Sequence, residues 1–425
     1  MNILHVVASL QPVSGGPARS VTRLASEQVR LGHSVVIVAF NESHLGENLA
    51  APGVSCHFVG SSLLSIRGRG WSPQFRRVVM EEAVKADVVH DHGLWMWPNA
   101  YAREAAVAVG KPLVISPRGM LEPWSLNRSK LRKAFAWWLF EKNNLQSAML
   151  FHATAASEET SIRNIVSRRL RRMNADSCLG GDTRERSGAP RSNEHGVRVV
   201  VAPNGVDLPD LSRRPPRGIL EEKFPRLKGR PWVVFMSRLH PKKGLNVLLR
   251  AWAKQRHETT PRDGRNMLVL AGSDLIGYRK AVETMVLELG VSDSVVLTGE
   301  LLGESKDCLL ANAEVFVLPS YSENFGTVVA EAMSWGRPVI ASTGTPWKEV
   351  VEVGAGWWVK PEEEAVCLAL EEAISTTQEE LKVIGARGRA LVAERYGWTM
   401  PAARLVEAYE DILATTRSSR RSKAH

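Results

Sequence analysis

Cysteine is scarce in this sequence, and no two cysteines lie close together. The 425 residues include four cysteines, and none of them belongs to a C-x-x-C pair. This pattern excludes the usual spacing of a zinc ribbon or a dithiol redox motif. It also argues against a disulfide framework, so we expect a chain that works in a reducing compartment. The cysteines are Cys56, Cys178, Cys308 and Cys367.

Long apolar segments are also missing. No run of about 18 apolar residues occurs, so we expect no helix that crosses a bilayer. The segment from Met1 to Ser9 has neither the basic region nor the long apolar region of a signal peptide. We therefore expect a cytoplasmic location, either free or peripheral on the inner face of the membrane.

The first glycine-rich turn lacks the dinucleotide-binding fingerprint. It runs from Gln11 to Pro17 and follows the apolar run Ile3 to Ala8. A nicotinamide-dependent dehydrogenase needs G-x-G-x-x-G at this position, because those glycines let the backbone approach a pyrophosphate closely. The sequence therefore excludes that class of enzyme.

Positive charge, by contrast, is plentiful. The formal net charge is +10 and the pI is about 9.6, a balance that attracts nucleotides, nucleic acid or an acidic membrane surface. Surplus surface lysine and arginine would give the same figures, so charge alone selects no partner.

The arginine-rich segment Ser167 to Gly196 is poor in apolar residues, and we expect a disordered insertion there. No aromatic residues interleave with its arginines, which argues against a nucleic acid partner.

The first half of the chain alternates strands and helices. Two short apolar runs, Ile3 to Ala8 and Val35 to Phe40, are separated by a helical pattern from Val21 to Leu31. This order is typical of a βαβ unit with parallel strands. Further strands are expected at Asp87 to His90, Pro112 to Ser116, Met149 to Thr154 and Val197 to Ala202.

The alternation resumes after a segment rich in proline and charge, Asp207 to Gly229, which we interpret as a linker. Helices follow from about Glu379, and the basic end, Arg417 to His425, is expected to fray. We thus expect an N-terminal domain at 1–206, a second domain at 207–398, and a C-terminal helix at 399–425 that packs back toward the first domain. Strands are expected at Trp232 to Met236, Met267 to Ala271, Val295 to Leu297, Val315 to Leu318 and Pro338 to Ala341.

The sharpest motif is the segment Pro319 to Met333, which follows an expected strand and opens a helix. Its two glutamates, Glu323 and Glu331, are eight residues apart. Carboxylates suit vicinal diols because each oxygen accepts one O–H group. The N–H groups at the start of the helix, 324–327, would suit a phosphate.

A second basic motif follows the expected strand Trp232 to Met236. It contains Arg238 and the pair Lys243-Gly244. Arginine offers a planar fork of donors and lysine a point charge, so the two cations would neutralise a pyrophosphate. The alternative is a solvated basic loop.

These motifs together resemble the retaining glycosyltransferases of the GT-B fold, specifically the GT4 family. The resemblance rests on Glu323 and Glu331, on Arg238 with Lys243-Gly244, on the hinge Pro203 to Asp207, and on the Gly15-Gly16 turn. It covers nearly the whole chain, although the Ser167 to Gly196 segment has no clear counterpart. It implies an α/β protein with two facing Rossmann-like domains, parallel sheets and an interdomain cleft.

The resemblance also implies a role for each motif. Glu331 should hold the nucleotide ribose, and Glu323 should contact the transferred sugar. Arg238 and Lys243 should stabilise the departing diphosphate. Gly15 and Gly16 should let the backbone approach it. The backbone of Asn324, Phe325, Gly326 and Thr327 should contact sugar and phosphate.

Two residues of the N-terminal half complete the implied site. His92 follows a strand, where the family has a histidine close to the reacting sugar, and His90 competes for that role. Arg118 resembles an acceptor or phosphate contact, with a structural salt bridge as the alternative. Glu349 could be a ligand, but we favour a helix-start residue.

The resemblance implies transfer of a sugar from a nucleotide-diphosphate donor to a carbohydrate or lipid-linked acceptor, with retention of configuration, in cell-surface polysaccharide synthesis. The accepted mechanism is a same-face displacement that rests on positioning and charge. No D-x-D motif occurs, so we expect a metal-independent enzyme with no cofactor besides the donor.

Two other functions remain open at this point. A sugar-nucleotide 2-epimerase shares the architecture and would need no acceptor, and a non-catalytic nucleotide-sugar binding protein would need no turnover. The basic, aromatic segment Lys130 to Lys142 also has two interpretations. It would either lie on an anionic membrane, beside a lipid-linked acceptor, or pack its aromatic residues into the domain core.

Overall fold

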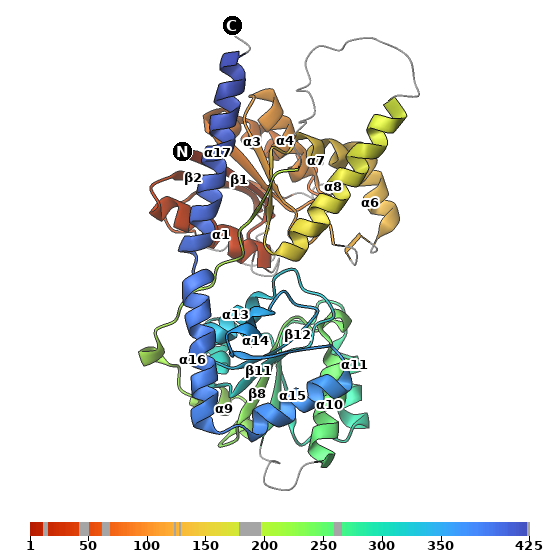
Figure 1. Cartoon of the computed structure of the whole chain (residues 1–425), viewed down its shortest axis with the longest axis vertical. Helices are drawn as coiled ribbons and strands as arrows, with labels where there is room; N and C mark the ends of the chain where they lie inside the picture. The colour runs from red at the N-terminus through yellow and green to blue at the C-terminus, as the bar shows by residue number, and fades with distance from the viewer. Residues whose placement is uncertain are drawn as a thin grey trace. The chain divides into compact units, whose positions relative to one another are not determined.

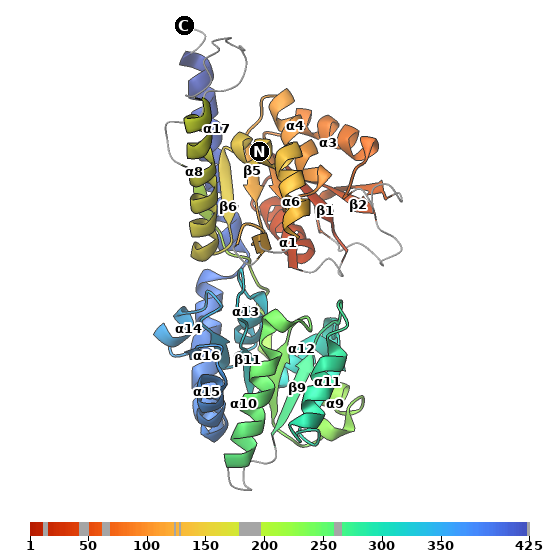
Figure 2. The ribbon, with the colours of Figure 1, turned by 90° about the vertical axis from the view of Figure 1, so that its right-hand side faces the viewer.

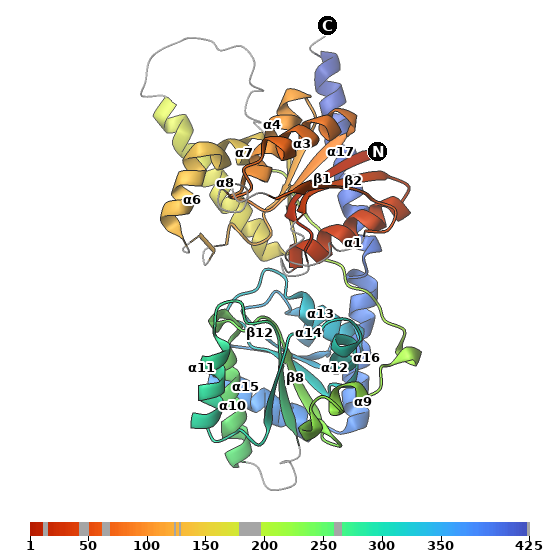
Figure 3. The ribbon, with the colours of Figure 1, turned by 180° about the vertical axis from the view of Figure 1, so that it is seen from behind.

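The computed structural model describes residues 1–11, 16–41, 51–61, 69–122, 125–126, 129–177, 197–258 and 266–422. The chain divides into two compact units (Figure 1, Figure 2, Figure 3). The first unit is Met1–Gly205 together with Trp398–His425, and the second is Val206–Gly397. The sequence placed the same two boundaries one residue later, after 206 and after 398.

The described strands of the first unit form one sheet in which all neighbours are parallel. Their order is β3-β2-β1-β4-β5-β6-β7, so the direction of progression reverses between β1 and β4. This is the Rossmann-like order. The strands are β1 (Asn2–Ser9), β2 (Ser34–Asn41), β3 (Ser55–Gly60), β4 (Val88–His92), β5 (Leu113–Ser116), β6 (Leu150–Ala153) and β7 (Val199–Val201).

Helices cover both faces of this sheet. One face packs against α3 and α4, which lie side by side (Figure 2), and against α7 and α8. The other face packs against α1 and the C-terminal helix α17, through Leu405, Tyr409 and Ile412. The helices are α1 (Gly16–Arg30), α3 (Pro73–Lys85), α4 (Trp97–Ala108), α6 (Lys130–Ala136), α7 (Lys142–Ser147), α8 (Ala156–Ser177) and α17 (Thr399–Ser422), and a π-helical turn, η3 (Trp137–Glu141), joins α6 to α7.

The second unit repeats the same design. Its described strands form a parallel sheet in the order β10-β9-β8-β11-β12-β13, which reverses between β8 and β11. The expectation of two Rossmann-like domains with parallel sheets is therefore confirmed. The strands are β8 (Trp232–Met236), β9 (Met267–Ala271), β10 (Val295–Gly299), β11 (Val315–Leu318), β12 (Val339–Ser342) and β13 (Gly356–Val359).

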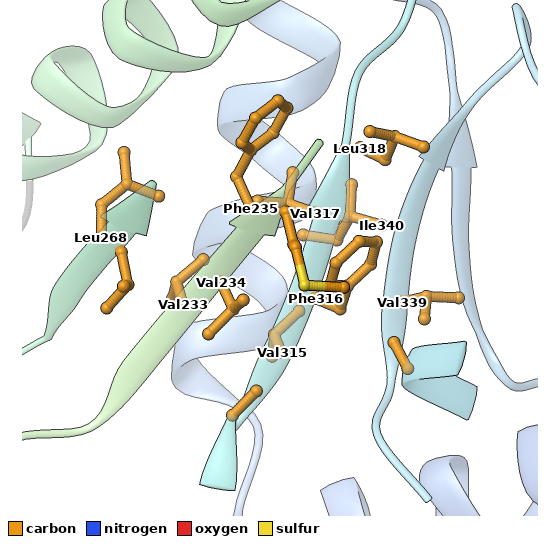
Figure 4. Packing of buried hydrophobic residues seen from close by; sticks show 14 of the residues in the cluster. Val233, Val234, Phe235, Leu268, Val315, Phe316, Val317, Leu318, Val339 and Ile340 are labelled. Carbon is orange, nitrogen blue, oxygen red and sulfur yellow. The ribbon is translucent and has the colours of Figure 1, made fainter. Parts of the chain in front are cut away.

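The central strands of this sheet are apolar along their whole length because helices bury both of their faces. Figure 4 shows Val233, Val234 and Phe235 of β8 beside Val315 and Phe316 of β11 in this core. On one side α10 packs with α11 and α15, and on the other α12 packs with α9 and α13, and α13 with α16. The helices are α9 (Gly218–Glu221), α10 (Leu245–Glu258), α11 (Arg279–Glu288), α12 (Gly303–Asn312), α13 (Thr327–Ser334), α14 (Glu349–Glu352), α15 (Glu363–Ser375) and α16 (Gln378–Arg395).

Three expectations from the sequence need correction. Helix α8 continues to Ser177, so 167–177 is helical rather than disordered, and the remainder, 178–196, lies outside the described residues. Helix α17 continues to Ser422, so most of the basic end is helical. The supposed linker 207–229 contains α9 and buries Leu220 and Leu227 completely, so it belongs to the core of the second unit. Within the described residues, no helix has the length and apolar character needed to cross a membrane.

Candidate functional site

The two sequence motifs of the second unit flank the point where its strand order reverses. The chain leaves β8 toward Arg238 and Lys243, and it leaves the neighbouring strand β11 toward Glu323. Ligands of open α/β sheets bind outside the carboxyl ends of the strands at such a switch point. The fold thus brings both motifs to one edge of one sheet.

Glycines let the loops at this edge touch through their backbones. Gly244 has φ +70, and a Cβ there would lie 2.0 Å from the carbonyl oxygen of Pro319. Tyr321 N–H donates to the carbonyl of Lys242 at 2.9 Å, which ties the same two loops together. A larger residue at position 244 would separate the loops, so the Lys243-Gly244 pair has a structural reason as well as a chemical one.

Lys243 and Glu323 form the centre of this edge. Lys243 Nζ lies 2.5 Å from Glu323 Oε1, and each side chain is 11% exposed. Ser320 Oγ donates to the same carboxylate oxygen at 2.7 Å, and Glu323 N–H donates to the carbonyl of Gly344 at 2.7 Å. The carboxylate and the cation expected at the site are therefore directly paired, on loops 80 residues apart.

Glu331 has a different partner. It lies in α13, and its Oε1 accepts from Lys306 Nζ of α12 at 2.6 Å. Its Oε2 is buried and has no hydrogen-bond partner among the described residues. A buried acceptor without a partner is costly, so this oxygen is suited to an O–H donor from a ligand.

The turn between Glu323 and α13 is held by tryptophan. Gly326, at φ +74, precedes the helix, and Trp347 Nε1 donates to the carbonyl of Phe325 at 2.6 Å. The Phe325 ring is 5% exposed and packs against Trp347 and Tyr396. Phe325 therefore contributes its side chain to the core. The N–H groups of Thr327 and Val328 have no acceptor within the helix and face out from its N-terminus, whereas Val329 N–H donates to the carbonyl of Gly326 at 2.9 Å.

Arg238, the other cation expected at this edge, has different surroundings from Lys243. Its side chain is exposed, and it forms no ion pair with any described residue. Glu349, by contrast, begins α14 as expected and accepts from Arg395 at 2.7 Å. This contact supports the interpretation of Glu349 as a helix-start residue.

In the first unit, both candidate histidines are buried. His90 Nδ1 lies 2.6 Å from the Tyr409 hydroxyl, and His92 is 4% exposed at the end of β4. Arg118 Nη2 lies 3.1 Å from His92 Nδ1, and His92 Nε2 lies 2.8 Å from His5 Nδ1. His5 Nε2 in turn lies 2.7 Å from Oε1 of the Gln28 side chain.

The chemistry of these groups fixes which one donates and which one accepts in each of these hydrogen bonds. Arginine can only donate, so His92 Nδ1 accepts, and its proton resides on Nε2 and points to His5. His5 then donates from Nε2 to Gln28. Burial lowers the pKa of His5 to about 4 and the pKa of His92 well below its usual value, so both rings are neutral. These hydrogen bonds hold the His92 ring in place, and His92 in turn positions the Arg118 guanidinium.

Arg118 itself has a left-handed backbone, at φ +55. Burial lowers its pKa to about 10, and its Nη1 donates to Asn204 Oδ1 at 2.7 Å, in the hinge motif. Among the described residues no carboxylate pairs with Arg118, so the salt bridge considered from the sequence is not formed. Gly16, at the start of α1, is exposed, and a Cβ there would meet no described atom within 4 Å. Gly15 lies outside the described residues.

The same histidines are the described residues that come nearest to a metal site. Ring nitrogens of His5, His90 and His92 lie within 4.8 Å of one another. A metal ion needs an unprotonated nitrogen from each ring at about 2.1 Å. The proton between His92 and His5 occupies one of those positions, and Arg118 occupies the other nitrogen of His92. The arrangement fits a hydrogen-bond chain better than a metal centre.

Several residues at these two sites were not identified from the sequence. Ser320 and Lys306 hold the two glutamates, and His5, Gln28 and Asn204 complete the network around Arg118. Ser320 lies within the motif and could have been proposed as a partner. Asn204 lies in the hinge motif, but its partner Arg118 is 86 residues away. Lys306, His5 and Gln28 are far away in the sequence from the residues that they contact, and no local pattern marks them.

Two family models match the chain, one in each unit. The model described as "Glycosyl transferases group 1" matches residues 217–390, and the "Glycosyl transferase 4-like domain" matches residues 15–175. Together they cover well over half of the chain. The protein therefore belongs to the group 1 glycosyl transferases, the GT4-type family with the GT-B fold.

Curated relatives are similar to parts of this chain, and solved structures share its fold. An MMP alpha-(1->4)-mannosyltransferase from Mycolicibacterium hassiacum is 33% identical over 41% of this chain and 41% of its own. A D-inositol 3-phosphate glycosyltransferase from Nocardia farcinica is 30% identical over 51% of this chain and 48% of its own. The chain thus matches less than half the length of these relatives. The Anabaena HepE structure in complex with UDP-glucose shares the fold, with a TM-score of 0.70 and 19% identity over 97% of this chain and 100% of its own.

Proposed function

We propose that this protein transfers a sugar from a nucleoside-diphosphate donor to a carbohydrate or lipid-linked acceptor, with retention of configuration, in cell-surface polysaccharide assembly. We further propose that it needs no metal ion and acts in the cytoplasm, either free or on the inner face of the membrane. One observation supports the proposal above all others. The Lys243–Glu323 pair lies at the switch point of the second unit, beside a helix N-terminus, within the region matched by the group 1 family.

The second unit would bind the donor. The buried Oε2 of Glu331 would accept a ribose hydroxyl, while Lys306 fixes the other oxygen. The N-terminus of α13 would receive the diphosphate, because its N–H groups and helix dipole favour an anion. Lys243 would then lie between a phosphate and Glu323, and Glu323 would turn its free oxygen toward the sugar.

The chemistry would depend on charge stabilisation. The bond between the anomeric carbon and the diphosphate oxygen breaks, and a bond to the acceptor oxygen forms on the same face. The acceptor proton passes to the departing diphosphate oxygen. Arg238 and Lys243 would offset the charge that develops on the diphosphate, which is the task a metal ion performs in other transferases.

The first unit would bind the acceptor through Arg118. Its guanidinium is held by Asn204 and His92, so it is preorganised for an anionic or hydroxyl-rich group. Both nitrogens of His92 are already engaged, which supports a positioning role through Arg118. Direct contact between His92 and the reacting sugar, expected from the resemblance, stays a prediction.

The relatives do not select one donor. One curated relative from Mycolicibacterium smegmatis is described as GDP-mannose-dependent, whereas the HepE structure contains UDP-glucose. The first experiment is therefore a panel of UDP-, GDP- and ADP-sugars with mixed glycan and lipid-linked acceptors. Release of nucleoside diphosphate and the anomeric coupling constant of the product would be measured by NMR.

The outcomes separate the competing functions. Product with the donor's anomeric configuration supports the proposal, and an inverted product contradicts it. Conversion of donor to its C2 epimer without acceptor would favour the epimerase, and binding of donor without turnover would favour a binding protein. The metal-free mechanism predicts an unchanged rate in EDTA. A complete loss of activity that Mg²⁺ or Mn²⁺ restores would refute it.

A further inference from the structure

One helical segment of the first unit has apolar side chains on two opposite faces. Helix α6 and the π-helical turn η3 bury Ala136 and Phe140 against the domain core. On the other side, large apolar side chains are exposed. They are Leu131, 88% exposed, Phe135, 64%, Trp138, 78%, and Leu139, 38%.

The spacing of these residues places them on one outward stripe. At about 100° per residue in α6, Phe135 projects within roughly 40° of Leu131, and Ala136 projects on the other side. In the π-helical turn that follows, Trp138 is exposed and Phe140 is buried. Figures 1 and 3 show α6 at the margin of the first unit. A helix that is apolar on both sides needs a second apolar environment, because the core satisfies only one of its faces.

Unpaired positive charge borders this stripe. Lys130 and Arg132 flank Leu131, Lys142 follows at the other end, and none of the three forms an ion pair with a described residue. The only acidic residue between 129 and 147 is Glu141, which is fully buried and accepts from Trp95 N–H at 2.6 Å. The exposed surface is therefore apolar at its centre and cationic at its rim.

We propose that this surface, which we call the α6 face, docks on an anionic phospholipid bilayer. Leucine, phenylalanine and tryptophan would enter the boundary between headgroups and acyl chains, and the cations would contact lipid phosphates. A second copy of the chain fits less well, because a two-fold contact would bring two cationic rims together. This proposal does not depend on the proposed transfer reaction.

The test is sedimentation of the full chain with vesicles of two compositions. One set contains equal parts of phosphatidylglycerol and phosphatidylcholine, and the other contains phosphatidylcholine alone. The apolar variant is Leu131→Ser, Phe135→Ser and Trp138→Ser. Its matched control, with exposed apolar residues of the second unit, is Leu287→Ser, Leu368→Ser and Val383→Ser.

A second pair of variants tests the charge. The cation variant replaces three lysines or arginines on the α6 face, and its control replaces three exposed cations elsewhere. Each basic residue near an anionic surface contributes about fivefold in affinity, so the cation variant should bind on the order of 100-fold more weakly. The cation variant is Lys130→Gln, Arg132→Gln and Lys142→Gln, and the control is Lys228→Gln, Lys280→Gln and Arg404→Gln.

The proposal expects the unaltered chain and both controls to sediment with the anionic vesicles. The apolar and cation variants should remain in solution while keeping the Tm of the unaltered chain. An unaltered chain that stays in solution with anionic vesicles would overturn the proposal, as would an apolar variant that still sediments. A dimer that the apolar variant abolishes, without vesicle binding, would show that a second copy covers this face. Transfer to a soluble acceptor, measured in parallel, should be unchanged in all variants, which separates this test from that of the proposed function.

Discussion

Arg238 and Lys243 have the same proposed task, but the protein surrounds them differently. Lys243 is 11% exposed and lies 2.5 Å from Glu323. Arg238 is exposed and has no ion-pair partner in the part of the chain that the structure describes. Replacing either cation should therefore reduce the rate of transfer, but only the replacement of Lys243 should reduce stability.

The stability difference follows from burial. Removing one partner from a fully buried ion pair costs about 3–5 kcal/mol, because the other charge is left without a partner. Both side chains here retain some contact with solvent, and Ser320 still donates to Glu323. We therefore expect Lys243→Met to cost about 2 kcal/mol, or about 4–8 °C in Tm for a unit of this size. Arg238→Ala should change stability by less than about 0.5 kcal/mol.

The rates should fall together. Loss of one group that stabilises developing charge typically lowers kcat by about 10²–10³, so we expect that range for both variants. The assay is the initial rate of nucleoside diphosphate release with acceptor, alongside thermal unfolding. Arg250→Ala, an exposed cation of α10, is the control and should change neither quantity. The double variant Lys243→Met with Glu323→Gln should recover part of the Tm but none of the rate. Unaltered transfer by Arg238→Ala, or a Tm loss as large as that of Lys243→Met, would refute the reasoning.

Two further predictions concern backbone geometry and pH. The Gly244→Ala variant should unfold at a much lower temperature than the Gly277→Ala variant. Both glycines have a similar positive φ, but only a Cβ at position 244 would meet a described atom, the carbonyl oxygen of Pro319 at 2.0 Å. Equal Tm values of the two variants would contradict this. Burial raises the pKa of Glu141 from 4.5 to about 7. Between these two values the folded chain keeps a proton that the unfolded chain loses, so the free energy of unfolding falls as the pH rises through this range. The Glu141→Gln variant should lack this pH dependence. Measured by urea unfolding, its free energy of unfolding should rise by up to about 3 kcal/mol relative to that of the unaltered chain between about pH 5 and about pH 8. Parallel pH profiles of the two proteins would contradict the prediction.

The sequence predicts the central strands of both sheets and also the edge strands β7 and β10. The apolar runs 232–236 and 315–318 coincide with β8 and β11 residue for residue. The two strands that it misses, β3 and β13, are edge strands of their sheets. β3 mixes polar with apolar residues and is mostly exposed, so it gives no continuous apolar run. β13 has four residues and begins with glycine, so its apolar run is short.

The same limit applies to the candidate site. Each motif could be predicted because its residues are neighbours in the sequence and follow a strand. The contacts between these residues, by contrast, depend on how distant segments of the sequence pack. Examples are the pairing of Glu331 with Lys306 and the hydrogen bonds that link Arg118, His92 and His5. The exposure of Trp138 likewise depends on which face of α6 the core covers. The sequence left both interpretations of that helix open, and the structure resolves the burial of each side chain.

Binding of nucleoside diphosphates, measured by isothermal titration calorimetry, tests the central claim most directly. UDP, GDP and ADP would each be titrated into the unaltered chain, Arg238→Ala and Lys243→Met, with the matching monophosphates and nucleosides as controls. The account predicts that one diphosphate binds more tightly than its monophosphate, and that this advantage shrinks by at least tenfold, about 1.4 kcal/mol, in both variants. A diphosphate that binds all three proteins equally, or none of them, would contradict it.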